Sequence, residues 1–566
     1  MKVDRERVLI GASLVLGLML TCACDDGGLY QKDFKRIAAG GIDDRLNSYP
    51  WAMELFDGDR DGTPEVYIGS LGNALCIQTP GMFWLDYLIP GYTFLPPERW
   101  QCPNPLWDPA DWTAFLSAAF SPAYVFRGTY DPAGDTLLWE RVWAPDLETE
   151  VLGFRGAREF GDALYICSNH RDGPAVWKSV DGRVFERASP PDMGIFGGPM
   201  PPGFRGAQVF KGRLCVASDQ AAAIFCSPDP STDPASWQPG NSTGFVDSGG
   251  GVREIVHWTG TVTGATPGTL TDEAGTWLPN MHQGRQVRIT AGAGAGQDRL
   301  IASNSLNSLT VTPDWTTLPD PASTYEIHDP VAMVNGPIWQ MAVFDGHLYA
   351  ITFSLTGDGP ELWKTDDPAP GNWTRVIQGG YGNKGSGFMS ARPFGDHLYI
   401  GTAVYPPLFA AGMEIQGCEI LRVDADDNVE LVVGKPRPEG AVGPDPVWPI
   451  SGMRRGFGYL SNLYVWYMAE YDGWFYAATS DFNGMVLDTL AEFVPGLVDL
   501  AGLFLGPTGF DLWRTRDGVK WVKVTDTGFG GRDNYGVRNL KETPWGFLLG
   551  TANAVDGFEL WMGKKE

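Results

Sequence analysis

The chain has 566 residues, of which 43% are hydrophobic and 12% aromatic, so it can build a large packed core and global disorder is excluded. Its 73 glycines and 43 prolines favour many short strands joined by turns over long helices. The formal net charge of −26 argues against a nucleic-acid partner, because no basic stripe is left to neutralise phosphates.

The N-terminus carries a targeting segment. Basic residues come first, the apolar stretch 8–20 is short for a membrane span, and Ala23-Cys24 precedes an acidic, glycine-containing run. This resembles a bacterial lipoprotein signal, although Thr21 stands where that family usually has leucine. We therefore expect residues 1–24 to be a signal peptide and Cys24 to carry the lipid. The protein would be an exported lipoprotein, anchored to the outer membrane or cell surface by the lipid alone. An ordinary secretion signal is the alternative, and it also implies export.

Export provides a setting in which disulfides persist. We predict two of them, Cys76–Cys102 and Cys215–Cys226. The first would staple an aromatic-rich loop, and the second would join two short strands that face each other across a tight turn. The partners of Cys167 and Cys418 stay open.

A short pattern recurs along the chain and predicts the architecture. An aromatic residue, a turn pair and an apolar run ending in Thr or Ser occupy residues 160–168, 210–218, 344–352, 394–402 and 471–479. A Leu-Trp-Lys-Thr type of element and then an Asp-Gly turn follow, so each unit has four short strands. A four-stranded sheet that repeats every roughly 40 to 50 residues is typical of a propeller.

The units number seven, with first strands near residues 51, 151, 202, 335, 386, 462 and 534. The last unit ends at Trp561 without a fourth strand, and residues 33–38 have the pattern of one. We predict that this segment completes the last blade and closes the ring, which removes two exposed sheet edges. The fold class is therefore an all-β, seven-bladed β-propeller of four-stranded antiparallel blades.

The repeat resembles that of a known group of proteins. Leu-Tyr-x-Gly-Thr, followed by Leu-Trp-Arg-Thr-x-Asp-Gly-x-x-Trp, is similar to secreted bacterial propellers related to sialidase-type Asp-box proteins. The turn at Asp517 is one residue shorter than the usual Asp-box. Because such turns are structural in that family, the resemblance implies the fold and not a sialidase activity.

Residues 259–328 interrupt the repeat and are rich in Thr and Gly. They resemble a small β module of phage tail proteins, and we interpret them as an inserted β domain. The expected domains are the signal peptide at 1–24, three blades with the closing strand at 25–258, the insertion at 259–328 and four blades at 329–566.

The longest additions to the repeat fall on one predicted face. In a propeller of this strand order, the loops between second and third strands and between blades share the face that holds the channel mouth. The additions there are residues 77–121, the inserted domain, 402–416, 434–459 and 482–507. Loops on a rigid scaffold often carry function, so this loop-rich face is the expected binding surface.

Aligning the first strands on their last aromatic residue brings one residue of each blade to the same level. These residues are Trp51, Arg155, Arg205, Trp339, Met389, Trp466 and Arg538. We expect them near the start of the innermost strands, at the channel mouth. Arginine forks bind carboxylates and indole faces stack on sugar rings, so the arginines and tryptophans predict a site for an acidic glycan. The alternative is that they pack between blades, with each arginine bonded to neighbouring carbonyls.

One acidic turn has the spacing of a calcium loop, D-x-D-x-D-G. Its candidate ligands are Asp57, Asp59, Asp61, Thr63 and Glu65. We expect any bound Ca²⁺ to be structural and to brace the first turn on the face away from the channel mouth. A solvated acidic turn is the alternative.

Four carboxylates recur at the start of third strands, namely Glu361, Glu419, Asp511 and Glu559. Paired carboxylates can perform glycosidase chemistry, but a residue shared by several blades is more typical of a structural contact. No catalytic residue is assigned. Our main hypothesis is non-catalytic binding of a glycan or a surface protein on the loop-rich face. The alternatives are a carbohydrate-active enzyme, either a glycosidase or a lyase, and a structural component of a cell-surface assembly.

Overall fold

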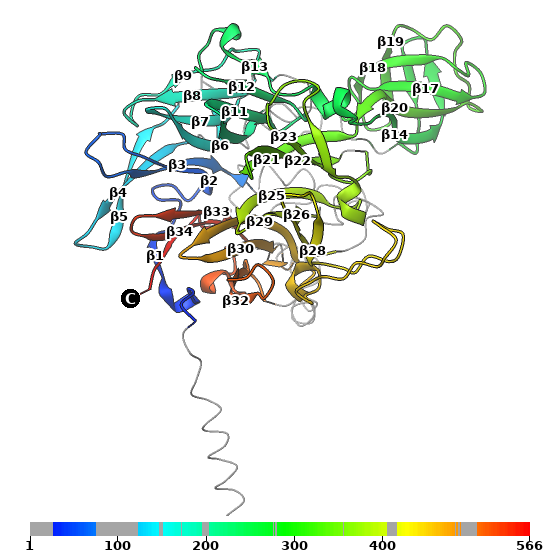
Figure 1. The fold of residues 1–566 in the computed structure, drawn as a ribbon. Coiled ribbons are helices and arrows are strands. Elements are labelled where there is room, and N and C mark those ends of the chain that lie inside the picture. Colours follow the sequence, from blue (N-terminus) through cyan, green and yellow to red (C-terminus); the bar gives the residue numbers. More distant parts are fainter. Residues whose placement is uncertain are drawn as a thin grey trace, which may run out of the picture.

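The protein is almost entirely antiparallel β-structure in the computed structural model (Figure 1). The structure describes residues 26–74, 123–145, 151–170, 173–194, 203–275, 277, 280–354, 356–404, 416–481, 483–484, 487 and 507–565. The signal segment with Cys24, the Cys76–Cys102 pair and most of the predicted 77–121, 402–416 and 482–507 loops lie outside these residues. Within them, no helix is long and apolar enough to cross a membrane.

A four-stranded antiparallel unit repeats along the chain, with each strand paired to the next. The first two units comprise β2 (Asn47–Phe56), β3 (Glu65–Gly72), β4 (Val125–Asp131) and β5 (Thr136–Trp143), then β6 (Val151–Phe160), β7 (Ala163–His170), β8 (Ala175–Ser179) and β9 (Glu186–Arg187). The next two comprise β10 (Phe204–Phe210), β11 (Arg213–Ser218), β12 (Ile224–Ser227) and β13 (Gln238–Pro239), then β21 (Asn335–Phe344), β22 (His347–Ser354), β23 (Leu362–Thr365) and β24 (Thr374–Ile377).

The following two units comprise β25 (Gly387–Phe394), β26 (His397–Ala403), β27 (Ile420–Val423) and β28 (Val429–Val433), then β29 (Asn462–Tyr471), β30 (Trp474–Asp481), β31 (Leu512–Thr515) and β32 (Val522–Thr525). The C-terminal unit has β33 (Gly536–Thr543), β34 (Gly546–Ala552) and β35 (Leu560–Gly563). Its fourth strand is β1 (Phe34–Ala38), which pairs antiparallel with β35 so that Arg36 lies opposite Trp561. The predicted pairing of the 33–38 segment with the end of the chain is therefore confirmed.

The first strands of the units are neighbours in chain order. Each of β2, β6, β10, β21, β25 and β29 contacts the first strand of the next unit, and β33 contacts β2. The sheets pack face to face through buried apolar side chains, as where Tyr399 and Ile420 of one unit meet Val465 and Phe475 of the next. The arrangement is propeller-like, and the first strands surround its centre (Figure 1).

The Asp-Gly turns hold neighbouring units together. The Asp517 carboxylate accepts hydrogen bonds from the amides of Val519 and Lys520, at 2.9 and 2.7 Å. The next residue, Gly518, has a φ of 71°, and a Cβ there would lie 1.7 Å from the hydroxyl of Tyr399 in the preceding unit. Glycine is therefore required both for the turn and for the close approach. These contacts support a structural role for the Asp-box-like turns.

A second repeated motif escaped the sequence analysis. Before four first strands, an aromatic residue follows glycine and adopts a positive φ between 52° and 57°, namely Phe245, Tyr381, Phe457 and Phe529. Such a conformation is unusual for a bulky residue. Phe245 stacks on Trp363 and Phe457 on Trp513, each at 4.8 Å and nearly parallel, so the aromatic ring covers the third-strand tryptophan of its neighbouring sheet.

The inserted segment forms a sheet of its own. Its strands are β14 (Val252–Thr261), β15 (Gly264–Thr266), β16 (Thr269–Thr271), β17 (Gln286–Ala291), β18 (Asp298–Asn304), β19 (Ser308–Thr312) and β20 (Thr324–Met333), in the order β14-β20-β17-β18-β19-β16-β15. A separate apolar core includes Trp277, Ile289 and Tyr325. The sheet stands out from the rest of the molecule (Figure 1). Its outer pair starts before residue 259 and ends after 328, so the paired segment is longer than the predicted insertion.

The predicted disulfide between Cys215 and Cys226 is present, with the two residues opposite each other on β11 and β12. Cys167 and Cys418 are free thiols in the described part of the chain, and both are buried. Burial raises the pKa of Cys167 to about 12 and that of Cys418 still further, so neither is a reactive thiolate.

Candidate functional site

The seven residues aligned from the sequence line one central cavity. Trp51, Arg155, Arg205, Trp339, Met389, Trp466 and Arg538 all contribute to its wall. Four of them, Trp51, Arg155, Trp339 and Trp466, are each the fifth residue of a ten-residue strand, which is further from the strand start than predicted. Arg205, Met389 and Arg538 are the second or third residues of shorter strands, near the strand start.

Three arginines and three tryptophans at this level stack on each other in pairs. The guanidinium carbon of Arg155 lies 4.1 Å from the ring centre of Trp51, and that of Arg205 lies 4.4 Å from Trp339. Arg538 stacks on Trp466 at 4.4 Å. In these cation–π contacts the face of the guanidinium packs on the indole ring. The N–H groups at its edge therefore remain available for hydrogen bonds.

The cavity wall is strongly cationic. Its described lining contains five arginines, Arg155, Arg158, Arg205, Arg392 and Arg538, and no carboxylate. Burial tends to raise the pKa of Tyr467, which also lines the cavity, but nearby cations, with Arg392 foremost, outweigh burial and lower that pKa. A cationic cavity in a chain of net charge −26 attracts anions locally.

Two carboxylates lie next to the cavity, and both are already engaged. Asp219 accepts from Arg155 at 2.6 Å and from the Asn169 amide at 3.0 Å. Glu54 forms ion pairs with Lys541 and with Arg158. They leave an excess of positive charge around the cavity.

Arg538 has no carboxylate partner among the residues that the structure describes. Its exposed fraction is 8%, and it has no hydrogen bond or ion pair to any residue that the structure describes. Burial, with the like charge of Arg155 as a further cause, lowers the pKa of its guanidinium to about 9. The indole N–H groups of Trp51 and Trp466 are also buried without an acceptor in the described part of the chain. A buried cation with neighbouring unused donors is costly unless an acceptor enters.

Sequence reasoning missed the second layer of the cavity. Arg158 and Arg392 each follow an aligned residue by three positions on the same strand, and both reach the cavity. Arg392 donates to the hydroxyl of Tyr467 at 2.6 Å. The alignment of the first strands could have identified them, because it also places the residues three positions after Arg155 and Met389 at one common level.

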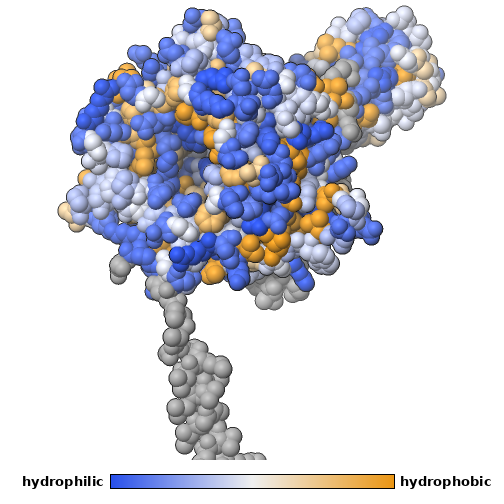
Figure 2. All heavy atoms as spheres, viewed as in Figure 1, coloured by the Kyte–Doolittle hydropathy of each residue, from blue (hydrophilic) through white to orange (hydrophobic). Residues whose placement is uncertain are grey.

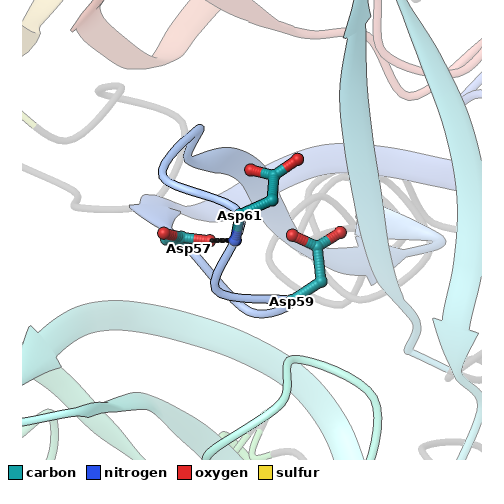
Figure 3. Close-up of side chains that lie close together, drawn as sticks. All are labelled: Asp57, Asp59 and Asp61. Carbon is teal, nitrogen blue, oxygen red and sulfur yellow. Dashed lines mark hydrogen bonds between the residues drawn. The ribbon is translucent and has the colours of Figure 1, made fainter.

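The calcium loop is only partly assembled as a cation site. Ligand atoms of Asp57, Asp59 and Asp61 lie within 4.8 Å of one another on the turn between β2 and β3 (Figure 3). The Asp57 carboxylate, however, accepts the amides of Asp61 and Gly62 at 3.1 and 2.9 Å.

The other candidate calcium ligands are engaged or exposed. Arg127 pairs with both Asp59 and the buried Glu65, while Thr63 is exposed. A guanidinium therefore already supplies the positive charge that Ca²⁺ would bring, and calcium binding stays a prediction.

The recurring carboxylates of the third strands have structural partners. The side-chain amides of Asn335, Asn383, Asn462 and Asn534 donate to Glu361, Glu419, Asp511 and Glu559, at 2.7 to 2.9 Å. Three of these carboxylates also pair with arginine, as Glu419 does with Arg437 at 2.6 Å. The same contact in four units connects the beginning of a third strand to the beginning of the first strand or the residues just before it, which favours the structural interpretation over acid–base catalysis.

The surface in the view of Figure 2 is predominantly hydrophilic, with apolar groups scattered between charged ones. A cleft of about 420 Å³ lies over the fifth unit and is lined by Lys384, Lys435, Arg437 and Arg455 among others. Much of its charge is directed at the buried Glu419, which Arg437 and Arg455 both contact.

Comparison with known proteins gives limited information. No family model matches the sequence, and no curated protein matches it. Among solved structures, a GH74 xyloglucanase from Xanthomonas campestris is 15% identical with a TM-score of 0.32, covering 92% of this chain and 59% of its own. This chain thus spans less than two thirds of that protein.

Two further similar structures are a computationally designed protein, Ika8, and a GH43 β-xylosidase/α-arabinofuranosidase from a compost microbial metagenome. Ika8 is 8% identical with a TM-score of 0.34, covering 93% of this chain and 99% of its own. The GH43 enzyme is 13% identical with a TM-score of 0.24, covering 71% of this chain and 97% of its own. TM-scores this low carry no argument about function.

Proposed function

We propose that the protein is an exported, membrane-anchored lipoprotein that binds an acidic ligand without turning it over. Its body would be a closed seven-bladed β-propeller, and the ligand, an acidic glycan or an acidic group of a surface protein, would bind over the central cavity. The observation that carries this proposal is the ring of stacked arginines and tryptophans around a cavity that has no carboxylate among its described lining residues.

Ring closure is supported by two contacts between the ends of the chain. β1 supplies the fourth strand next to β35, and β33 lies against β2. A closed ring holds the seven first strands at a fixed distance, so the arginines they carry are positioned before a ligand arrives. Such preorganisation reduces the entropy cost of binding.

Anchoring through Cys24 is supported by the segment that follows it. Leu29 is 1% exposed, and its amide donates to the Tyr476 hydroxyl at 3.0 Å. Asp26 accepts from Arg514 at 2.8 Å. The chain is therefore docked on the propeller from two residues after the predicted lipid site, and the lipid would hold the body close to the membrane surface.

A binding experiment with the soluble chain from residue 25 onward tests the proposed function. A glycan array is expected to show retention of acidic glycans without product formation. Arg155→Ala and Arg205→Ala are expected to weaken retention by about tenfold or more, because hydrogen bonds from charged donors to an acid each contribute on the order of 1.5–3 kcal/mol.

Arg60→Ala is the matched control, since Arg60 is 64% exposed on an outer turn. Product formation on the polysaccharides would instead favour the carbohydrate-active alternative. Retention that is equal in both cavity variants and the control would contradict the proposed site.

A further inference from the structure

The central cavity combines a buried cation, unused donors and little space. The cavity at the level of Arg538 has a volume of about 60 Å³, which holds a few water molecules or one small anion but no sugar ring. The predicted mode of binding, with indole faces stacked on sugars, does not fit here. The faces of Trp51, Trp339 and Trp466 are already covered by arginines.

We infer that the cavity is a specific site for a single oxyanion group, which Arg538 binds together with the indole N–H groups of Trp51 and Trp466. This inference rests on the proposed function and names the part of the ligand that is recognised. The group is a carboxylate, phosphate or sulfate at the end of a larger molecule, whose remainder stays above the ring level.

Among the described residues, no acceptor reaches Nε of Arg538 or the indole N–H groups of Trp51 and Trp466. Asp219 is held by Arg155, Asn169 and the Gly203 amide, and Glu54 is held by Lys541 and Arg158. Arg538 packs against Trp466 at 4.4 Å and against Trp51 at 5.4 Å, so two indoles fix the plane of its guanidinium. A planar fork held in this way suits two oxygens of one anion.

The surrounding charge also selects an anion. Arg155 and Arg205 lie at the same level on other strands, and their stacked guanidinium groups lend positive potential without closing the cavity. A neutral sugar would leave Arg538 uncompensated, whereas an oxyanion neutralises it. The site discriminates against neutral ligands because a ligand without the anionic acceptor leaves the buried donor without a hydrogen bond.

Calorimetric titration of the soluble chain with sodium phosphate, sodium sulfate and sodium acetate tests the inference. We expect saturable one-to-one binding of at least one of these anions, with a rise in melting temperature as the anion is added. Arg538→Gln is expected to weaken that binding by about tenfold or more. Arg538→Lys keeps the charge but loses the planar fork, so it is expected to bind more weakly than wild type. Acetate alone would identify a carboxylate site, and phosphate or sulfate alone a tetrahedral one.

Wild-type measurements keep the inference falsifiable even if an Arg538 variant does not fold. The absence of saturable binding for all three anions would overturn it, as would unchanged binding in a folded Arg538→Gln variant. Arg60→Gln is the surface control. If acidic glycans are retained and Arg205→Ala abolishes that retention while none of the anions binds, the proposed function stands and this inference alone fails.

Discussion

Two arginines in this protein are buried in nearly the same way and have opposite surroundings. Arg514 is fully buried between the rings of Tyr30 and Trp474, at 4.4 and 4.2 Å, and donates to Asp26. Arg538 is equally enclosed by Trp466 and Trp51, but no carboxylate reaches it within the described residues.

The partner of the guanidinium, rather than its packing, separates a structural arginine from a binding one. Aromatic packing around a guanidinium is common to both and says nothing about function. A carboxylate partner, Asp26, pairs with Nη2 of Arg514 and connects the N-terminal segment to the sixth unit. The absence of such a partner leaves Arg538 with a desolvation cost that the fold does not offset. The following predictions test this contrast, in order of the expected effect on stability.

Replacing Arg514 should have the largest effect. Arg514→Ala is expected to lower the free energy of unfolding by about 3 kcal/mol, since it removes a fully buried side chain together with its contacts with two aromatic rings. Denaturant unfolding measures this. Arg516→Ala is the control, because Arg516 is exposed two residues further along the same segment. Equal effects of the two variants would show that the N-terminal dock is unimportant.

A substitution at Gly28 would perturb the contact between the N-terminal segment and Arg514 without replacing the arginine. A Cβ on Gly28 would lie 1.9 Å from Nη1 of Arg514 and 2.9 Å from the Trp474 ring. Gly28→Ala is therefore expected to cost about 2 kcal/mol through overpacking. Thermal unfolding should show a lower midpoint, whereas Gly27→Ala, which meets no atom within 4 Å but has a φ of 87°, should cost less. A neutral Gly28→Ala would argue that the segment is not held as described.

Arg538 should behave in the opposite way to Arg514. Arg538→Met is expected to leave stability unchanged or raise it by about 1 kcal/mol, because it removes an uncompensated buried charge and keeps an apolar stem of similar length. The same variant should lose anion binding. A loss of stability as large as that of Arg514→Ala would mean that Arg538 has a structural partner and would break the contrast.

The dock at Arg514 should also respond to acid. Burial tends to raise the pKa of Asp26, but the hydrogen bond from Arg514 and that from the Gly28 amide outweigh it and lower the pKa. A carboxyl whose pKa is lower in the folded state contributes stability above its unfolded pKa of about 4 and loses it as the pH falls further. Wild type should therefore lose more stability than Asp26→Asn below about pH 4, and parallel pH profiles would contradict this.

Calcium should have the smallest effect on stability. Arg127 already pairs with Asp59 and Glu65, so a bound ion would add little positive charge that the turn lacks. We expect the melting temperature to be higher in millimolar calcium than in chelator. The corresponding gain in the free energy of unfolding should be less than about 1 kcal/mol. Asp61→Asn should abolish that gain. No difference between calcium and chelator would leave the turn as a solvated acidic loop.

The sequence was sufficient for the features that recur. Strand periodicity and the Asp-Gly turns located the four-stranded units, the end-to-end pairing of β1 and the Cys215–Cys226 disulfide. The same register predicted that Arg155, Arg205 and Arg538 would share one level, because a repeat carries equivalent positions to equivalent places.

The sequence was insufficient for features that occur once. Arg155 pairs with Asp219, 64 residues away, and Lys541 pairs with Glu54 across most of the chain. Periodicity does not predict such partners, so the lack of a carboxylate beside Arg538 becomes apparent only when the units are packed together.

Arg538 is, in our proposal, a buried cation that binds an anion from solution. Crystals of the soluble chain soaked in sodium selenate test it most directly, because selenium gives an anomalous signal at the anion itself. We predict an anomalous peak within hydrogen-bonding distance of the Arg538 guanidinium, inside the ring of Trp51 and Trp466. A structure in which Arg538 instead pairs with a carboxylate of the protein, with no selenium peak in the cavity, would contradict the account.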